Sequence, residues 1–333
     1  MRKGVAAIAI FMVILLIGLG AWYFTSVSPT FSGTPESITI GVVPSDMSGL
    51  IYIADDRGFF TGNGLNVTYR DYGSGPSSVN GLTSNEVDVA LSSEYTIDGQ
   101  AFNNENISVI GCIDRFQNTY LIGWKDRGIE NASDLKGKTI GLTENTISSF
   151  YIGRFLNLNG LSMQNVTLVD LPFPQNVPAF TNGSVDALVT AISSIDSIQN
   201  LSSNDTVLWS VQSDQPGYLV ISCRNSWIAS HPEQIDRLLK SLDQAEQYTI
   251  DHPDESKAII QKQLNYTDAY MATSWSNNQY SLTLDQSLLT AMNDEGQWMI
   301  DNNLTTVKAL PDLSSYIYTK GLEDVKPEAV DIR

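Results

Sequence analysis

The stretch TIGVVPSDMSGLIYIADDRGFF at residues 39–60 has a counterpart in TIGLTENTISSFYIGRFLNLNG at residues 139–160. In each copy, Thr-Ile-Gly leads into a polar loop and then into a segment with apolar residues on one side of a helix. The first helix is predicted to open at Ser48 and the second at Ser148. The two stretches therefore indicate two related structural units in one chain.

The correspondence continues in the same order along both units. Asn-Gly-Leu at 63–65 and at 159–161 leads into a predicted strand, and residues 82–90 match residues 180–188. Strands that alternate with helices favour parallel pairing. We therefore predict an α/β fold with two similar lobes, each a mostly parallel sheet flanked by helices and joined to the other by hinge crossovers.

The predicted strand ends are polar in both units, whereas the strands before them are apolar. These ends are Val43–Met47, Ser92–Tyr95, Thr143–Thr146 and Thr190–Ser194. In open α/β sheets, ligands bind outside the carboxyl ends of the strands. If the two lobes face each other, these four loops line one cleft, and a ligand is expected there.

Beyond Gly217 the repeat stops. Tyr218–Cys223 is expected to be a strand that crosses back, and helices follow it. The clearest helix has apolar residues at helical spacing, at Ile235, Leu238, Leu239, Leu242 and Ala245. This tail is expected to cover the cores and to tie the lobes together.

The first 25 residues predict a membrane segment. Arg2 and Lys3 precede an uncharged run from Gly4 to Phe24, long enough to cross a hydrocarbon core of ~30 Å. The positive-inside rule then leaves the rest of the chain outside the cell. The alternative is a cleaved signal peptide, whose apolar core is usually shorter, ~7–15 residues. Residues 26–37, rich in Ser, Thr, Pro and Gly, are predicted to be a linker.

Charge and motif content exclude several functions. The net charge is −18, from 37 acidic and 19 basic residues, which argues against a nucleic-acid partner. His231 and His252 each precede a proline that suits a helix start, so neither is expected to act as a base or metal ligand. The sequence contains no metal-ligand cluster, nucleophile elbow or phosphate loop. We expect no catalysis, no cofactor and no metal.

Two further features concern the extracytoplasmic placement. Cys112 and Cys223 could form a disulfide there, but both lie in apolar strand-like runs and could equally be two buried thiols. The chain also carries acceptor sites for N-glycosylation, which would make it a glycoprotein in a suitable host. They begin at Asn66, Asn106, Asn131, Asn165, Asn182, Asn200, Asn204, Asn265 and Asn303.

Several segments resemble a known family. They are IYIADDRGFF at 51–60, GSGP at 73–76, SDLKGKTIG at 133–141 and GSVDA at 183–187. Together they resemble ABC-transporter substrate-binding proteins of the nitrate/sulfonate/taurine and thiamine-pyrimidine type, which have a type II periplasmic-binding fold. The resemblance covers roughly residues 38–265, and the Asp-Leu-Lys-Gly-Lys run is its most specific part.

The resemblance implies a domain plan and a set of ligand residues. Residues 38–117 and 223–333 would form the first lobe with the C-terminal helices, and residues 118–222 the second. The family's ligand loops map onto Ser45, Asp46, Ser93, Glu94, Tyr95, Thr143, Asn145, Thr146 and Ser193. The loop at 191–195 lacks the aromatic–acidic–Pro–Tyr run that many relatives have, which puts the family's usual ligands in question.

The implied function is an extracytoplasmic solute-binding receptor, a monomer that delivers its ligand to an ABC permease and ATPase. Helix starts at Pro76–Ser78 and Thr146–Ser149 suit an oxyanion, although Ser and Thr are also ordinary N-caps. Asp46, Glu94 and Glu144 suit an amine or a ring N–H, so the mixture favours a small organic anion or zwitterion over nitrate. A thiamine-pyrimidine precursor is the alternative ligand. A ligand-sensing domain or a pyrimidine-synthesis enzyme is the alternative class, and the cysteine cluster of that enzyme is missing.

Overall fold

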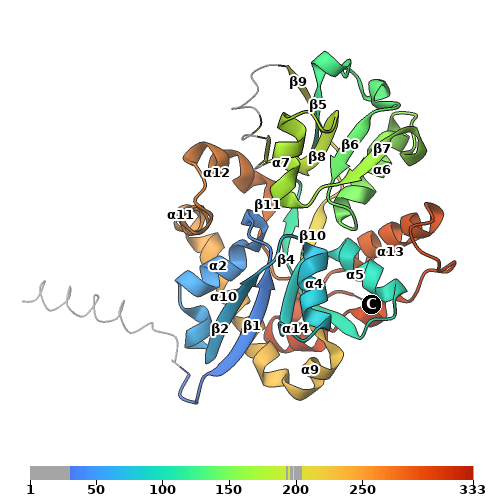
Figure 1. The fold of residues 1–333 in the computed structure, drawn as a ribbon. Coiled ribbons are helices and arrows are strands. Elements are labelled where there is room, and N and C mark those ends of the chain that lie inside the picture. The colour runs from blue at the N-terminus through green and yellow to red at the C-terminus, as the bar shows by residue number, and fades with distance from the viewer. Residues whose placement is uncertain (1–30, 193, 196–197, 199–204, 333) are drawn as a thin grey trace, which may run out of the picture.

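Two β-sheets form the framework of the computed structural model, which describes residues 31–192, 194–195, 198 and 205–332 (Figure 1). The predicted membrane segment at 1–25 lies outside the described residues. Within the described ranges, no helix is both long enough and apolar enough to cross a membrane.

The first sheet has six strands in the order β11-β4-β10-β3-β1-β2. Its three parallel strands are β1 (Glu36–Val42), β2 (Leu65–Asp71) and β3 (Val89–Ser93). The antiparallel strands are β4 (Ile107–Phe116), β10 (Gly217–Arg224) and β11 (Asn278–Gln279).

The second sheet has five strands in the order β7-β6-β8-β5-β9. Its parallel strands are β6 (Thr139–Leu142), β7 (Thr167–Asp170) and β8 (Ala187–Ala191). Strands β5 (Thr119–Trp124) and β9 (Thr206–Ser210) are antiparallel. Both sheets are therefore mixed rather than mostly parallel, because β10 in the first sheet and β5 in the second enter from the hinge and run against the parallel strands.

The sequence repeat appears in the two sheets as a matching pair of hydrogen bonds. The Thr39 amide donates to the Asp88 carboxylate at 2.9 Å, and the Thr139 amide donates to the Asp186 carboxylate at 2.9 Å. Each of these aspartates donates its own amide back to the threonine carbonyl, again at 2.9 Å. The segments 82–90 and 180–188 thus match because each places an aspartate that locks the third strand of its unit to the first.

Helices cover both sheets. The units supply α2 (Gly49–Asp56), α3 (Phe59–Gly62), α4 (Gly75–Thr83), α5 (Glu94–Phe102), α6 (Ile147–Leu158) and α7 (Phe173–Thr181). The tail supplies α9 (Asn225–Ser230), α10 (Pro232–Asp251), α11 (Pro253–Leu264), α12 (Asp268–Ser274), α13 (Gln286–Asp301) and α14 (Lys320–Val325). Short 3₁₀ turns are η1 (Asp46–Ser48), η2 (Lys125–Arg127), η3 (Ala132–Leu135), η4 (Met163–Asn165), η5 (Trp275–Asn277), η6 (Leu313–Tyr316) and η7 (Pro327–Ala329).

The tail returns to the first lobe. Helices α10 and α11 pack on α2, and α13 packs on α5. The face of α10 predicted from its helical spacing is buried, since Ile235, Leu238 and Leu242 are all fully buried. Residues 217–222 also belong to the first sheet as part of β10, so the second lobe ends earlier than the boundary expected at residue 222.

Two chain crossings connect the lobes, one between β4 and β5 and one between β9 and β10. Gln212 in the second crossing is almost fully buried and bonds to the first. Its side chain accepts from the Thr119 amide at 2.9 Å and donates to the Phe116 carbonyl at 3.0 Å. Gly217 allows close approach here, because a Cβ would lie 2.5 Å from the Phe116 ring and 2.9 Å from the Tyr151 hydroxyl. The two chain crossings of the hinge are therefore held together by hydrogen bonds.

The two cysteines lie on neighbouring strands of the first sheet. Cys112 on β4 pairs with Val220, and Cys223 on β10 pairs with Ser108. Both thiols are free and fully buried, and burial raises the pKa of each well above its usual range. The sequence allowed either a disulfide or two buried thiols, and the structure has two buried thiols.

Candidate functional site

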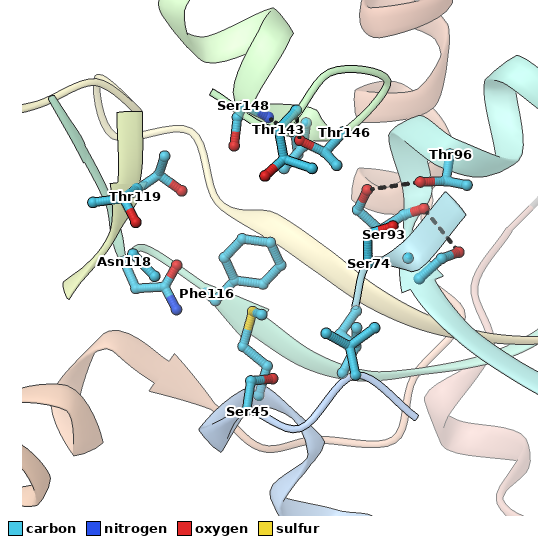
Figure 2. Close-up of a pocket in the computed structure, with 18 of the residues that line it drawn as sticks. Ser45, Ser74, Ser93, Thr96, Phe116, Asn118, Thr119, Thr143, Thr146 and Ser148 are labelled. Carbon is cyan, nitrogen blue, oxygen red and sulfur yellow. Dashed lines mark hydrogen bonds between the residues drawn. The ribbon is translucent and has the colours of Figure 1, made fainter. Parts of the chain in front are cut away.

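A cavity of about 180 Å³ lies where the carboxyl ends of the parallel strands of both sheets meet (Figure 2). The first lobe contributes Val43, Pro44, Ser45, Asp46, Met47, Gly73, Ser74, Gly75, Pro76, Ser92, Ser93 and Thr96. The second lobe contributes Thr143, Thr146, Ile147, Ser148, Asn176, Val189, Thr190 and Ala191. The hinge adds Phe116, Asn118, Thr119 and Leu219, and the tail adds Tyr266. The cavity is thus an interlobe site.

Three helices begin at the cavity wall. Ser74 is the N-cap of α4, Ser93 that of α5 and Thr146 that of α6. The first-turn amides of a helix have no intrahelical acceptor, and the helix dipole adds partial positive charge at this end. The convergence of three such ends gives the cavity hydrogen-bond donors without a basic side chain.

The second-lobe hydroxyls are already engaged as donors. Thr143 Oγ1 donates to the Leu171 carbonyl at 2.9 Å, and Thr146 Oγ1 donates to the Thr143 carbonyl at 2.7 Å. Thr146 also accepts from the Ser148 amide at 3.3 Å. Asn176 donates to the Thr190 hydroxyl at 3.1 Å. These bonds fix the side chains in place, so this wall of the cavity is preorganised.

The first-lobe loop after β1 contains the acidic group of the cavity. Asp46 is 3 % exposed, and its carboxylate accepts from Tyr270 at 3.2 Å and from Asn278 at 3.0 Å. Burial raises the pKa of Asp46, and the hydrogen bonds from Asn278 and Tyr270 oppose that shift. Next to it, the Ser45 hydroxyl is buried at the cavity with no hydrogen-bond partner. An unpaired buried hydroxyl at a cavity is suited to a ligand.

The predicted site residues divide into three groups. Ser45, Asp46, Ser93, Thr143 and Thr146 line the cavity. Glu94, Tyr95 and Asn145 do not line it. Ser193 lies outside the described residues.

The three residues outside the lining differ from each other in position. Glu94 opens α5 with its side chain turned into the interior, and Tyr95 packs its ring 6.4 Å from that of Trp298. Asn145 is exposed and has a positive φ of 57°, a conformation that asparagine tolerates. At each of these positions the backbone directs the side chain away from the cavity.

Other lining residues were missed by the sequence reasoning. Phe116, Asn118 and Thr119 belong to the first hinge crossing, and Tyr266 comes from the tail. For the Gly-Ser-Gly-Pro run at 73–76, the sequence predicted an oxyanion-binding helix start from Pro76 onward, but Gly73, Ser74 and Gly75 were expected only as a family signature. Its position directly after β2 was the signal that could have identified it.

The cavity is chemically neutral apart from Asp46. Among the described lining residues none is Lys, Arg or His. In the same described part of the chain, no group of His, Cys, Asp and Glu is arranged to hold a metal ion. The arrangement can bind a small polar group with neutral donors and an apolar group against Phe116, Leu219 and Val189.

Comparisons with known proteins identify the fold and the family of this chain. The chain is 26% identical over 268 residues to an aliphatic sulfonates-binding protein of Bacillus subtilis (strain 168), covering 77% of this chain and 76% of that one. The MOPS-bound alkanesulfonate-binding protein SsuA of Xanthomonas axonopodis pv. citri superposes with a TM-score of 0.75 at 15% identity, over 86% of this chain and 100% of that one. The desulfurization enzyme DSZB has a TM-score of 0.62 at 14% identity, over 88% and 99%.

The likeness to these two solved structures shows that the chain has the α/β fold of periplasmic binding proteins. DSZB is an enzyme, so the fold is not confined to binding proteins. The model of the family described as "NMT1/THI5 like" matches residues 47–256, more than half of the chain. This match includes the hinge and the whole second lobe, and it begins at Met47, the last residue of the first-lobe loop. It confirms the family resemblance seen in the sequence, and the chain belongs to the NMT1/THI5-like family.

Proposed function

We propose that this protein is the solute-binding receptor of an ABC importer, and that it captures a small organic anion or zwitterion between its lobes. The observation that carries the proposal is the origin of the cavity walls, which come from both lobes and from the hinge. A ligand shifts a conformational equilibrium only by its differential affinity for the two states. A ligand held by both lobes favours the closed form, which a permease and its ATPase can then recognise.

The donor set supports an anionic group on the ligand. Three helix N-termini and the unpaired Ser45 hydroxyl lie at the cavity, whereas its described lining holds no basic side chain. Neutral donors suit a singly charged group better than a doubly charged one, because no cation offsets the cost of removing the second charge from water. The Bacillus subtilis relative and the SsuA structure are named for sulfonate binding, and a sulfonate has this single charge.

The apolar lining supports an organic rather than an inorganic ligand. Phe116, Leu219 and Val189 offer surface for a hydrocarbon or ring, whereas nitrate has no group to place there. Asp46 can accept from an amine or a ring N–H. This feature keeps a zwitterion and a thiamine-pyrimidine precursor among the candidates.

The enzymatic alternative has less support. The structure of DSZB shows that this fold can host catalysis, so the fold alone does not decide the matter. Cys112 and Cys223, the two thiols of this chain, are both fully buried in the first sheet, away from the lining. A ligand-sensing role remains compatible with the same cleft and differs only in the partner.

We further propose that the globular part lies on the extracytoplasmic face, held by the apolar run from Gly4 to Phe24. Protease added to intact cells should then release a soluble fragment that contains the lobes. Protection of the whole chain under conditions that degrade a known surface protein would contradict this topology.

A calorimetric screen tests the binding function. Alkanesulfonates, ω-aminoalkanesulfonates, nitrate and aminopyrimidines should be compared, with a neutral sugar as the control. A true ligand at 100-fold its dissociation constant adds about 2.7 kcal/mol to the free energy of unfolding, which a thermal melt resolves. If only sugars or divalent metals bind, the proposed ligand class is wrong.

A further inference from the structure

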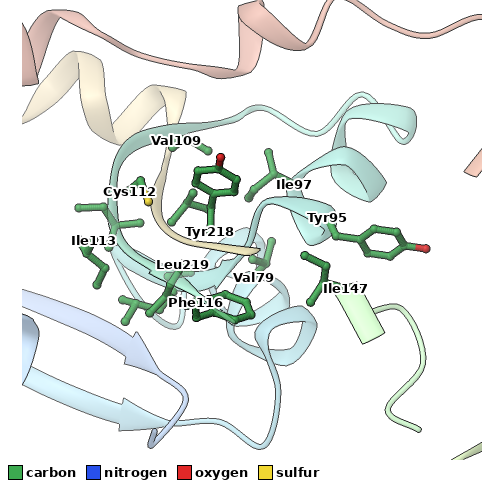
Figure 3. Close-up of a cluster of buried hydrophobic side chains, with 14 of the residues drawn as sticks. Val79, Tyr95, Ile97, Val109, Cys112, Ile113, Phe116, Ile147, Tyr218 and Leu219 are labelled. Atoms are coloured by element: carbon green, nitrogen blue, oxygen red, sulfur yellow. The ribbon is translucent and has the colours of Figure 1, made fainter. Parts of the chain in front are cut away.

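Three carboxyl groups lie together in the interior, outside the cavity. Glu94 and Asp98 are on α5, and Glu295 is on α13, which packs against α5. The exposed fraction of each side chain is 0 %. The surroundings are apolar, since Tyr95 and Ile97 of α5 belong to the same hydrophobic core as Ile147 of α6 (Figure 3).

These carboxyl groups have almost no partners. Glu94 Oε1 accepts from the Tyr218 amide at 3.0 Å, at the point where β10 leaves the hinge. The second oxygen of Glu94 and both oxygens of Asp98 and Glu295 have no hydrogen-bond partner. In the described part of the chain, none of the three forms an ion pair, and no acidic group there is arranged as a metal site.

Buried carboxylates without partners cannot all be ionised at neutral pH, because burial disfavours the charged form and neighbouring negative charges repel. Burial raises the pKa of Glu94 to about 8. Burial, and then the charge on Glu94, raises the pKa of Asp98 well above its usual range. Burial, and then the charges on Glu94 and Asp98, does the same for Glu295.

The cluster is covered by the second lobe. Helix α6 contacts α5, and its Phe150 ring packs edge-on against Trp298 of α13, with ring centroids 5.5 Å apart. Gly153 of α6 allows this contact, because a Cβ there would lie 2.3 Å from the Trp298 ring. The Tyr151 hydroxyl is buried with no hydrogen-bond partner, and its pKa is raised by burial and by the charges of Glu94 and Glu295.

We propose that Glu94, Asp98 and Glu295 form a proton-binding cluster that links protonation to the packing of the second lobe on the first. While α6 covers α5 and α13, the cluster holds protons. When this contact opens, water reaches the carboxyl groups and they ionise. High pH therefore favours separation of the lobes, and the proposal does not depend on which ligand the cleft binds.

The other groups that face the cluster leave this direction unchanged. Helix α6 brings Arg154, which lowers the pKa of Glu295 but ranks behind burial and the neighbouring carboxylates. The side chain of Arg154 also donates to Gln215. The remaining titratable groups are Tyr95 on α5, Tyr218 on β10, Cys112 on β4 and Asp294 on α13. Tyr316 of η6 bonds to the Ala101 carbonyl, and α4 and β3 have no titratable side chain.

Infrared spectroscopy of the full chain tests the first half of the proposal. The C=O stretch of protonated carboxylic acids should be present at neutral pH, and the part that comes from Glu94 should fade as the pH passes about 8. In Glu295→Gln the fading should move down by about one pH unit or more, because strongly coupled groups interact by at least that much. Asp301→Asn, at the exposed end of α13, is the control, because Asp301 is not among the groups that shift the pKa of Glu295, and it should match the wild type.

Small-angle scattering without ligand tests the second half. The radius of gyration of the wild type should increase as the pH rises past about 8, the value to which burial raises the pKa of Glu94. The increase should be smaller in Glu295→Gln and absent in the triple variant E94Q/D98N/E295Q. If the triple variant does not fold, the wild type and Glu295→Gln still decide the question.

Two results would overturn the proposal. Absence of the protonated band from the wild type at neutral pH would mean that the cluster is ionised. A band that fades while the radius of gyration stays constant would mean that protonation is not linked to the lobes. Ligand binding is not measured in either experiment, so failure here leaves the proposed receptor function intact.

Discussion

The two lobes repeat one structural unit, but their loops at the cleft are held differently. In the first lobe, the loop after β1 is bonded to the tail, since Tyr270 and Asn278 donate to the Asp46 carboxylate and Tyr280 donates to its carbonyl. In the second lobe, the corresponding loop after β6 bonds to its own unit through Thr143 and Thr146. A buried carboxylate needs donors, and the tail supplies them to the first lobe. The repeat therefore sets the positions of the two loops. The hydrogen bonds from the tail allow the first-lobe loop to contain a buried carboxylate.

The largest expected effect tests whether matching core positions of the two units contribute equally to the free energy of unfolding. Ile40 and Ile140 occupy matching positions on β1 and β6, and both side chains are fully buried. Replacing either by alanine should lower the free energy of unfolding by about 2–5 kcal/mol, because each leaves a cavity in a core. Urea unfolding followed by circular dichroism measures both. A loss below about 1 kcal/mol in one variant would break the equivalence.

The next effect tests the support that the tail gives to the first lobe. Asp46→Ala should cost about 1–3 kcal/mol of stability, because it removes the buried acceptor of the Tyr270 and Asn278 hydrogen bonds. Thr143→Val in the second lobe removes one hydrogen bond to a carbonyl and should cost only about 1 kcal/mol. Thermal unfolding of the ligand-free proteins compares the two. Equal losses would show that the tail adds no special support.

A smaller effect concerns ligand binding by the second lobe. Thr146→Ala should weaken ligand affinity by about 0.5–1.5 kcal/mol and reduce ligand-induced compaction, because it removes the hydrogen bonds that fix this wall of the cavity. Thr267→Ala is the matched control, because Thr267 caps α12 with its side chain in the same way but does not line the cavity. Calorimetry and small-angle scattering measure the two variants. If both bind the ligand as the wild type does, Thr146 acts only as a helix cap.

The smallest effect concerns acid stability in the second lobe. Asp186 accepts from the Thr139 amide and from Arg127, and its pKa is lowered although burial alone would raise it. A lowered pKa contributes stability above the unfolded value of 3.8, and this contribution is lost as the pH falls through the lower folded value. Asp186→Asn should therefore flatten the stability curve in that acid range, by less than about 1 kcal/mol. Arg127→Met should flatten it in part, and an unchanged acid slope in both variants would contradict the assignment.

The position of Glu94 in the structure changes which variant tests the charge of the ligand. From the sequence, Glu94 belonged to the ligand loops, so Glu94→Gln would have tested the charge of the ligand. In the structure Glu94 is interior and outside the lining. Asp46→Asn is now the variant that tests ligand charge, and it should weaken an amine-bearing sulfonate more than the matched alkanesulfonate.

Much of the site could be predicted because the repeat marks the strand ends. All five residues of Val43–Met47 line the cavity, as do Thr143 and Thr146 in the matching loop. The hinge residues Asn118 and Thr119 could not be found in this way, because they belong to a crossing that has no counterpart in the repeat. Tyr266 is remote in sequence and reaches the cavity only because α11 and α12 fold back over the first lobe.

The sequence alone determined the number of units, the order of their strands and helices, and the edge of each sheet at which the cavity lies. These follow from local periodicity and from turn residues, which are written in the chain itself. Only the tertiary structure decided which side chains at that edge face the cavity. Ser93 and Glu94 are neighbours, yet one lines the cavity and the other is buried beside Glu295, about 200 residues later in the chain. That choice depends on where α13 packs, and no local pattern around residue 94 contains this information.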